Sequence, residues 1–240
     1  MTTPWKSDTR NIILALAALT LIPVAAFIMK QSNPFSVHFP TGVPALILSC
    51  LMAAAFVWYC ICLSGFARIL IDENDRNNMK KVLYGNILLV VGTIVMFILV
   101  SIFIYINSDS AILSFTTVNQ ICSLLIMSVP VISYIKMRHG YYGLSKSPTL
   151  NDTCRSGFGY LCNSAEIKII CMITAAAGSL ICNIILKSGS MPFITKLEIC
   201  HMIVSVISLA NIILLGVSIV RIFKGWKLIR QSPPPAETEQ

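Results

Sequence analysis

Six long stretches of this sequence contain no Asp, Glu, Lys or Arg. They cover residues 11–29, 31–67, 82–108, 110–135, 169–186 and 199–220. A helix needs about 20 apolar residues to cross the hydrocarbon core of a bilayer, and each stretch reaches or approaches that length. Backbone amides in lipid must bond within their own segment, and the stretches are continuously apolar rather than alternating. We therefore expect helices and not a barrel.

The sequence thus predicts an all-α polytopic membrane protein, built as a bundle of six transmembrane helices. We expect spans at about 11–29, 44–67, 84–106, 112–135, 167–186 and 200–221. The composition agrees, since only 12% of the 240 residues are charged, against about 25% in a typical soluble domain. A soluble core of this length could not bury an apolar fraction of 56%.

The distribution of basic residues predicts the orientation. All but three of the 18 Lys and Arg residues lie before span one, between spans two and three, between spans four and five, or after span six; the exceptions are Lys30, Lys187 and Lys196. Cytoplasmic segments carry the excess of Lys and Arg, so both termini are expected inside. The net charge of +8 then reflects topology, and no nucleic-acid partner is expected, because no basic stripe with interleaved aromatics occurs.

This orientation divides the chain into a cytoplasmic N-terminus (1–10), a transmembrane domain (11–221) and a cytoplasmic tail (222–240), disordered from about residue 231. Residues 137–166 are expected to form a cytoplasmic loop, in which glycines allow sharp turns. Asn163 followed by Glu166 resembles a helix cap that opens span five. Lys168 and Lys187 flank this shortest span and can snorkel from its two ends.

Span one has two interpretations, a retained signal anchor or a cleaved signal peptide. Its apolar run is longer than a typical signal-peptide core, and residues 23–27 offer no clean A-x-A cleavage site, so we favour the anchor. Cleavage would leave the orientation of the other five spans unchanged.

Groups that carry chemistry are sparse. Most of the nine cysteines lie in or beside spans, no C-x-x-C occurs, and the chain has only three histidines. No span contains Asp or Glu, so a proton relay through an intramembrane carboxylate is not supported. We therefore expect no catalytic residue, no metal site, no cofactor and no enzymatic activity. Cys154 and Cys162 fall in the cytoplasmic loop, where thiols stay reduced, and no disulfide is expected.

Polar side chains follow one face of each of two spans. This candidate polar bundle face consists of Asn119, Gln120 and Ser123 in span four and His201, Ser205 and Ser208 in span six. Tyr134 falls on the same face as the first three, and Asn211 lies at the edge of the second group. Amides in lipid are costly, so we expect all six to point into the bundle. They either bond helices together or line a polar path.

Two functions remain open at this point. We favour a non-enzymatic accessory or interaction protein of the cell (inner) membrane, embedded in the lipid bilayer and contacting other membrane proteins or further copies of itself. The alternative is a transporter or channel for a small, uncharged or weakly charged solute. The absence of charge within any span favours the first. A polar cavity between spans four and six would favour the second.

Overall fold

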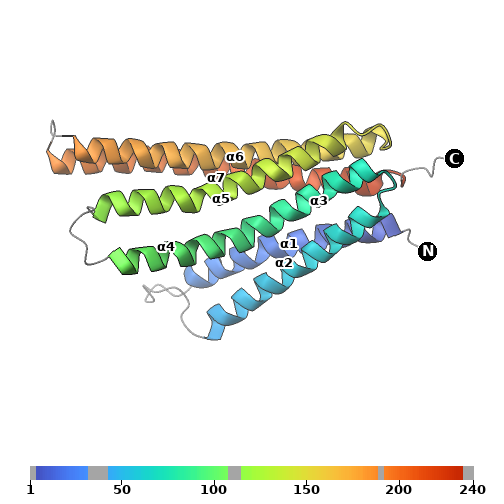
Figure 1. The fold of residues 1–240 in the computed structure, drawn as a ribbon, viewed down its shortest axis with the longest axis horizontal. Coiled ribbons are helices and arrows are strands. Elements are labelled where there is room, and N and C mark those ends of the chain that lie inside the picture. Colours follow the sequence, from blue (N-terminus) through green and yellow to red (C-terminus); the bar gives the residue numbers. More distant parts are fainter. Residues whose placement is uncertain (1–3, 32–42, 108–114, 189–191, 235–240) are drawn as a thin grey trace.

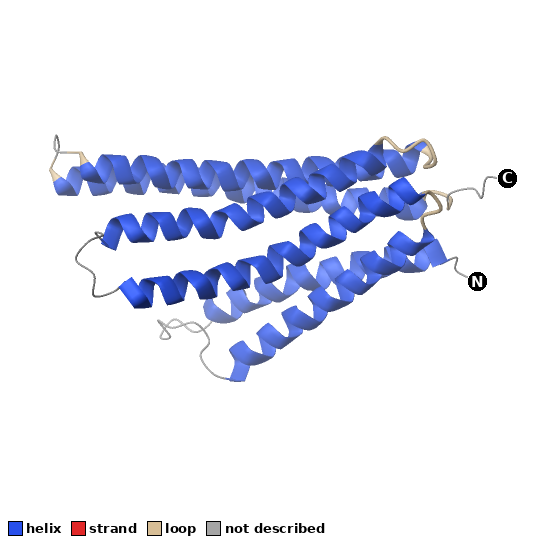
Figure 2. Cartoon of the chain, in the orientation of Figure 1, coloured by secondary structure: helices blue, strands red, loops and turns tan. Residues whose placement is uncertain are grey.

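Helices form nearly all of the chain that is described (Figures 1 and 2). The computed structural model describes residues 4–31, 43–107, 115–188 and 192–234. In chain order the elements are α1 (Pro4–Gln31), α2 (Val43–Ile69), α3 (Glu73–Ile87), η1 (Leu88–Gly92), α4 (Thr93–Asn107), α5 (Phe115–Ser145), α6 (Asp152–Lys187) and α7 (Phe193–Gln231). The elements α3, η1 and α4 follow one another without a break and form one rod with a π-helical turn inside it. These ranges contain no strand, in agreement with the predicted all-α class.

Four helical rods are long and apolar enough to cross a membrane, counted over the described residues. They are Ile47–Ile69, Glu73–Phe103, Asp152–Lys187 and Phe193–Gln231. The last two contain the windows predicted for spans five and six, and the first two overlap most of the windows predicted for spans two and three. The windows for spans one and four fall on α1 and α5, but six crossings stay a prediction. The chain is therefore a helical protein of the membrane-spanning type.

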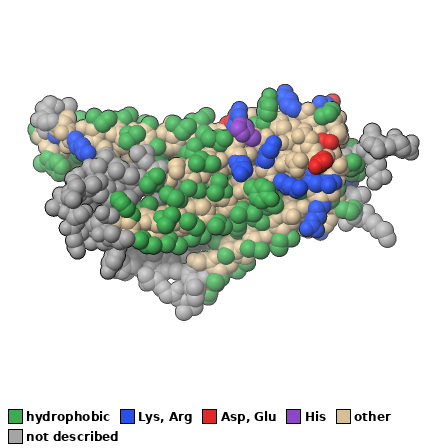
Figure 3. All heavy atoms as spheres, in the orientation of Figure 1, with side chains coloured by type: hydrophobic (Ala, Val, Ile, Leu, Met, Phe, Trp, Pro, Cys, Tyr) green, Lys and Arg blue, Asp and Glu red, His purple; other side chains and the backbone are tan. Residues whose placement is uncertain are grey.

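The helices form a closed ring at one end. α1 packs against α2 and α7, α6 lies between α7 and α5, and α3 joins α5 to α2. Both chain ends and the α2–α3 and α5–α6 turns lie at this end, which we call the packed end (Figure 1). Toward the opposite end, which we call the open end, α5, α4 and the α1–α2 pair spread apart, while α6 and α7 stay together (Figure 1). The blue Lys and Arg side chains visible in Figure 3 gather toward the packed end.

An aromatic core holds the packed end together. Trp5, Phe66, Phe158 and Trp226 come from four helices and are all at most 1% exposed. Their ring centroids lie 4.8 Å apart for Trp5 and Phe66, 5.6 Å for Phe66 and Trp226, and 6.4 Å for Phe158 and Trp226. The indole N–H of Trp5 donates to the carbonyl of Ile229 at 2.9 Å, which ties the start of α1 to the end of α7. Aromatic pairs at these distances stabilise beyond the area that they bury.

A buried carboxylate joins α3 to the α5–α6 turn. Asp75 is 1% exposed, and its Oδ2 accepts hydrogen bonds of 2.6 Å from the hydroxyls of Ser147 and Thr149. The backbone N–H of Asp75 in turn donates to the side chain of Asp72, the N-cap of α3. These contacts fix the turn against the helix that begins beside it.

The predicted cytoplasmic loop at 137–166 is wrong as a structure, because helix continues through most of it. α5 runs on to Ser145 and α6 already begins at Asp152. The glycines that favoured turns instead allow helices to approach one another. A Cβ on Gly143 would lie 2.4 Å from Nδ2 of Asn78, and one on Gly157 would lie 2.8 Å from the carbonyl oxygen of Gly225.

The structure also corrects the expected helix cap at Asn163 and the expected cytoplasmic tail from residue 222. The N-cap of α6 is Asn151, whose Oδ1 accepts from the N–H of Cys154 at 2.8 Å, whereas Asn163 is an exposed residue inside α6. The segment assigned to a tail continues as helix to Gln231 and buries Trp226 and Ile229 completely. The expected disorder from residue 231 falls largely on 235–240, outside the described residues.

Candidate functional site

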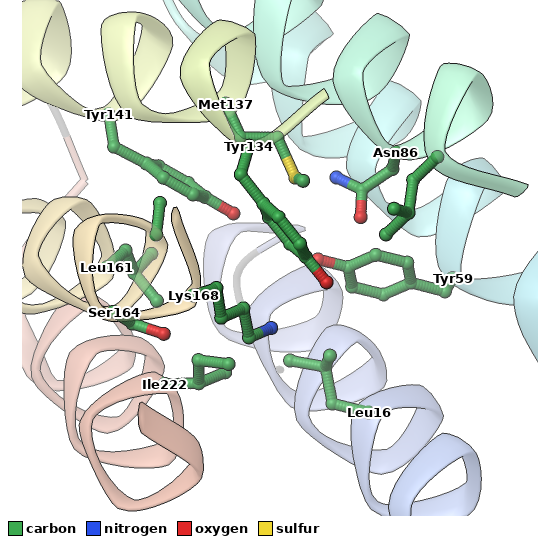
Figure 4. A pocket seen from close by; sticks show the side chains of 12 residues that line it. Leu16, Tyr59, Asn86, Tyr134, Met137, Tyr141, Leu161, Ser164, Lys168 and Ile222 are labelled. Atoms are coloured by element: carbon green, nitrogen blue, oxygen red, sulfur yellow. The ribbon is translucent and has the colours of Figure 1, made fainter. Parts of the chain in front are cut away.

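A partly enclosed cavity lies inside the ring, next to the aromatic core (Figure 4). About 80 Å³ of it is open to the centres of water-sized spheres. Its walls come from η1 and from every α-helix except α4: they are Leu16, Tyr59, Asn86, Leu89, Tyr134, Met137, Tyr141, Leu161, Ser164, Ala165, Lys168 and Ile222. A water needs about 10–15 Å³ of such space and two or more polar partners, so this cavity has room for several waters or one very small molecule.

The side chain of Lys168 points into this cavity. Figure 4 shows its ammonium group directed toward the space between Tyr134 and Tyr59. The nitrogen lies 5.2 Å from the centroid of the Tyr134 ring, which is a cation–π distance. Among the ion pairs of the described residues, none includes Lys168. Lys168 therefore turns into the bundle although the end of a span would also let it snorkel, because the ring of helices offers it a polar interior.

Three tyrosines surround the same space. Tyr59 is 5% exposed and Tyr141 is 6% exposed, and their hydroxyls point toward the cavity in Figure 4. Burial raises the pKa of Tyr141, and its hydrogen bond with Tyr59 offsets part of that rise. Phenols ionise only well above neutral pH, so these hydroxyls keep their protons near pH 7, and one proton of the Tyr59–Tyr141 pair is used in their mutual hydrogen bond.

The remaining polar wall residues are partly engaged. The hydroxyl of Ser164 shares a 2.7 Å hydrogen bond with Ser218 of α7. The amide nitrogen of Asn86 donates to the carbonyl of Val82 at 2.9 Å, which leaves its oxygen available. The π-helical turn begins two residues after Asn86 and places Leu89 on the cavity wall. Single π-helical turns inside helices are frequent at functional sites.

The structure describes only half of the candidate polar bundle face, and that half does not point inward as predicted. The side chains of Asn119, Gln120 and Ser123 lie outside the described part of the structure. His201, Ser205 and Ser208 are exposed on α7, so the prediction that they point inward is wrong for this chain alone.

The rotation of α7 explains this outcome. The helix packs through Cys200, Asn211 and Ser218. At 3.6 residues per turn, the neighbouring positions 201, 205 and 208 face about 100° away. Asn211, expected only at the edge of the stripe, instead donates to the carbonyl of Cys171 at 3.2 Å.

The described residues offer little support for a metal site or for thiol chemistry. No three His, Cys, Asp or Glu side chains gather as metal ligands would within the described ranges. Cys182 and Cys200 face each other across α6 and α7, each thiol donating to the other's backbone carbonyl, at 3.7 and 3.5 Å. Both are free thiols. This pair serves helix packing, as expected for buried cysteine.

Sequence reasoning missed the role of Lys168 and found only part of its surroundings. Tyr134 was assigned to the inward face of span four and does line the cavity. Lys168 stands at the boundary between a polar segment and an apolar run, where a lysine can turn either toward water or into the bundle. A charge one residue before an uncharged run was the only available signal.

No protein-family model, curated protein or solved structure matches this chain. The cavity and the placement of charge are therefore the features that bear on function.

Proposed function

We propose that this protein is a non-enzymatic integral membrane protein of the cell (inner) membrane that binds a small solute in the cavity around Lys168 and carries it across the bilayer. It would cross the membrane six times with both termini in the cytoplasm. The basic residues at the packed end support this orientation, because Lys and Arg concentrate on the cytoplasmic side.

The inward direction of Lys168 is the observation that carries the proposal. An ammonium at the centre of a spanning helix costs about 2.5–3.5 kcal/mol on insertion scales, and a lysine near a helix end usually avoids this cost by snorkelling. Lys168 lies at the edge of the predicted span 167–186, where snorkelling is open to it, yet its side chain points to the cavity. A polar group held inside a membrane bundle is by default a candidate for solute contact.

The lining residues favour binding over catalysis. General acid–base chemistry usually pairs two titratable groups within hydrogen-bonding distance, one of them tuned near neutral pH. The described residues of the cavity wall supply one ammonium and three phenols, and no carboxylate, histidine or thiol. The helices close the ring at the packed end but not at the open end. This asymmetry suits a solute site that is accessible from one side of the membrane at a time.

An accessory or interaction function remains the second candidate, and the exposed face of α7 favours it. His201, Ser205 and Ser208 lie among strongly exposed apolar residues such as Val206 and Leu209. Polar side chains facing lipid are costly, and small polar residues often mark a contact between transmembrane helices. The partner would be another membrane protein or a second copy of this chain.

Reporter fusions test the orientation. Fusions after residues 150 and 235 should behave as cytoplasmic, and fusions near residues 35 and 190 as external. External labelling of a single cysteine at position 150 in intact cells would overturn the assigned sidedness.

Solute entry into proteoliposomes, measured with a small panel of solutes, tests whether the protein carries a solute across the bilayer. Swelling would be followed by light scattering with urea, glycerol, nitrate and glycolate. We expect at least one to enter faster than into protein-free liposomes, and Ala165→Leu, which fills the cavity, to abolish the difference. Ala176→Leu is the matched control, because Ala176 lines an apolar groove between α5 and α6 away from the cavity. Unchanged permeability with correctly folded protein would reject carriage and favour the accessory function.

A further inference from the structure

We propose that the solute bound in the cavity is a short-chain monocarboxylate of about the size of acetate, held by the ammonium of Lys168. This inference rests on the proposed function, in that it assumes the cavity receives a solute at all. It adds the chemical class, which follows from the charge, the hydrogen-bonding groups and the size of the site.

The charge of the site is positive and unopposed. Among the described residues that line the cavity, Lys168 is the only charged one. The nearest acid along the chain, Glu166, is engaged elsewhere, since its Oε1 accepts a 2.7 Å charged hydrogen bond from Nε of Arg138 on α5. An ammonium in a medium of low dielectric constant attracts a negative ligand more strongly than it would in water. A monovalent anion would neutralise the site.

The hydrogen-bonding groups are mainly donors. The ammonium offers three N–H groups, and the hydroxyl of Tyr134 faces the same space (Figure 4), whereas the hydroxyl of Tyr59 already shares a hydrogen bond with Tyr141. The amide nitrogen of Asn86 and the hydroxyl of Ser164 already have partners. Two carboxylate oxygens provide about four acceptor positions, which suits this set.

Size and apolar walls narrow the anion further. About 80 Å³ of space for water-sized spheres admits a few heavy atoms but excludes a sugar, an amino acid with a large side chain or a nucleotide. Leu16, Leu161 and Ile222 add apolar surface to the cavity wall beside these polar groups. A methyl or ethyl group fits there, whereas a halide or nitrate would leave this surface in contact with water.

Thermal unfolding and calorimetry of the full chain in detergent test the inference, with N-methylglucamine gluconate as the background salt because gluconate is too large for the cavity. We expect acetate to raise the unfolding temperature saturably, and acetamide, its neutral isostere, to leave it unchanged. Benzoate should have no effect because of its size. Lys168→Met should weaken acetate binding at least about tenfold, the loss expected for a charged hydrogen bond.

Two further variants keep the test decisive. Lys187→Met removes a lysine from the other end of the same helix and should bind acetate as the parent protein does. Tyr134→Phe keeps the ring beside the ammonium but removes one donor, so it should weaken binding even if Lys168→Met fails to fold. Equal stabilisation by acetamide, equal binding of nitrate, or full binding by both cavity variants would each overturn the inference.

The outcomes separate this inference from the proposed function. Acetate binding without solute entry into proteoliposomes would reject carriage and support the carboxylate site. Entry of urea or glycerol, blocked by Ala165→Leu, without acetate binding would support carriage and reject the carboxylate.

Discussion

The packed end and the open end of the bundle differ in how far they bury large apolar side chains. Phe66 and Phe158 are completely buried at the packed end, whereas Phe97, Ile184 and Val206 in the apolar segments are 63%, 70% and 68% exposed. Water surrounds the cytoplasmic end in the proposed orientation, so burying aromatic surface there is strongly favourable. Lipid already solvates apolar side chains, so no comparable force packs the open end. Stability should therefore be concentrated where helices leave the bilayer.

The largest effect should follow from truncating the aromatic core. Phe158→Ala should lower the free energy of unfolding by about 3–5 kcal/mol, because the ring is fully enclosed by Phe66, Tyr141 and Trp226. Phe97→Ala is the matched substitution at an exposed apolar site and should have little effect. Thermal unfolding in detergent, followed by tryptophan fluorescence, measures both. Similar losses for the two variants would contradict the contrast between the ends.

A smaller effect should come from the close approach of α6 and α7. Gly157→Ala places a Cβ 2.6 Å from Ile229 and 2.8 Å from the Gly225 carbonyl, and should cost about 1–3 kcal/mol. Gly159→Ala lies two residues away and meets nothing within 4 Å. Alanine is the better helix former, so this control should be neutral or stabilising by up to about 1 kcal/mol. A stabilising Gly157→Ala would show that α6 and α7 do not cross as described.

The buried carboxylate should matter by a similar or slightly smaller amount. Asp75→Ala leaves the hydroxyls of Ser147 and Thr149 without their acceptor, and we expect a loss of about 1–3 kcal/mol. Glu73→Ala removes an exposed acid from the same helical turn and should cost less than about 1 kcal/mol. Limited proteolysis of the α5–α6 turn gives a second measurement, since cleavage after Lys146 should accelerate only in Asp75→Ala.

The smallest effects distinguish the two faces of α7. Asn211→Leu removes the hydrogen bonds to Cys171 and Thr174 and should cost about 0.6–2 kcal/mol. Ser205→Leu together with Ser208→Leu changes an exposed face and should leave the unfolding temperature of the monomer nearly unchanged. If that pair instead alters the oligomeric state in cross-linking or light-scattering measurements, the exposed stripe is a contact site for a partner helix.

Much of the helical content was predictable because the signal is local. An uncharged run of about 20 residues must satisfy its own backbone, which leaves only the helix in lipid. The predicted windows accordingly lie on the helices. The polar segments that continue these helices beyond the windows were interpreted as a loop and a tail. Residues 137–166 carry Gly, Tyr, Ser and Lys in a pattern common to loops, but buried contacts of Tyr141, Phe158 and Leu161 keep them helical. Such contacts join residues far apart in sequence and leave no local pattern.

The candidate site was less predictable than the fold. Tyr134 was placed on an inward face by periodicity alone, and it lines the cavity. His201, Ser205 and Ser208 share a face just as regularly, yet that face points outward. Periodicity shows which residues share a side of a helix but not the direction in which that side points.

The sequence by itself determined where apolar helices form and which of the segments between them carry Lys and Arg. Both follow from composition along the chain. Only the tertiary structure decided the rotation of each helix, and with it the direction of Lys168 and the exposure of the stripe on α7. Rotation depends on which surfaces find partners. Gly157 meets Gly225, and Asn211 meets Cys171, and those contacts turn each helix as one rigid unit.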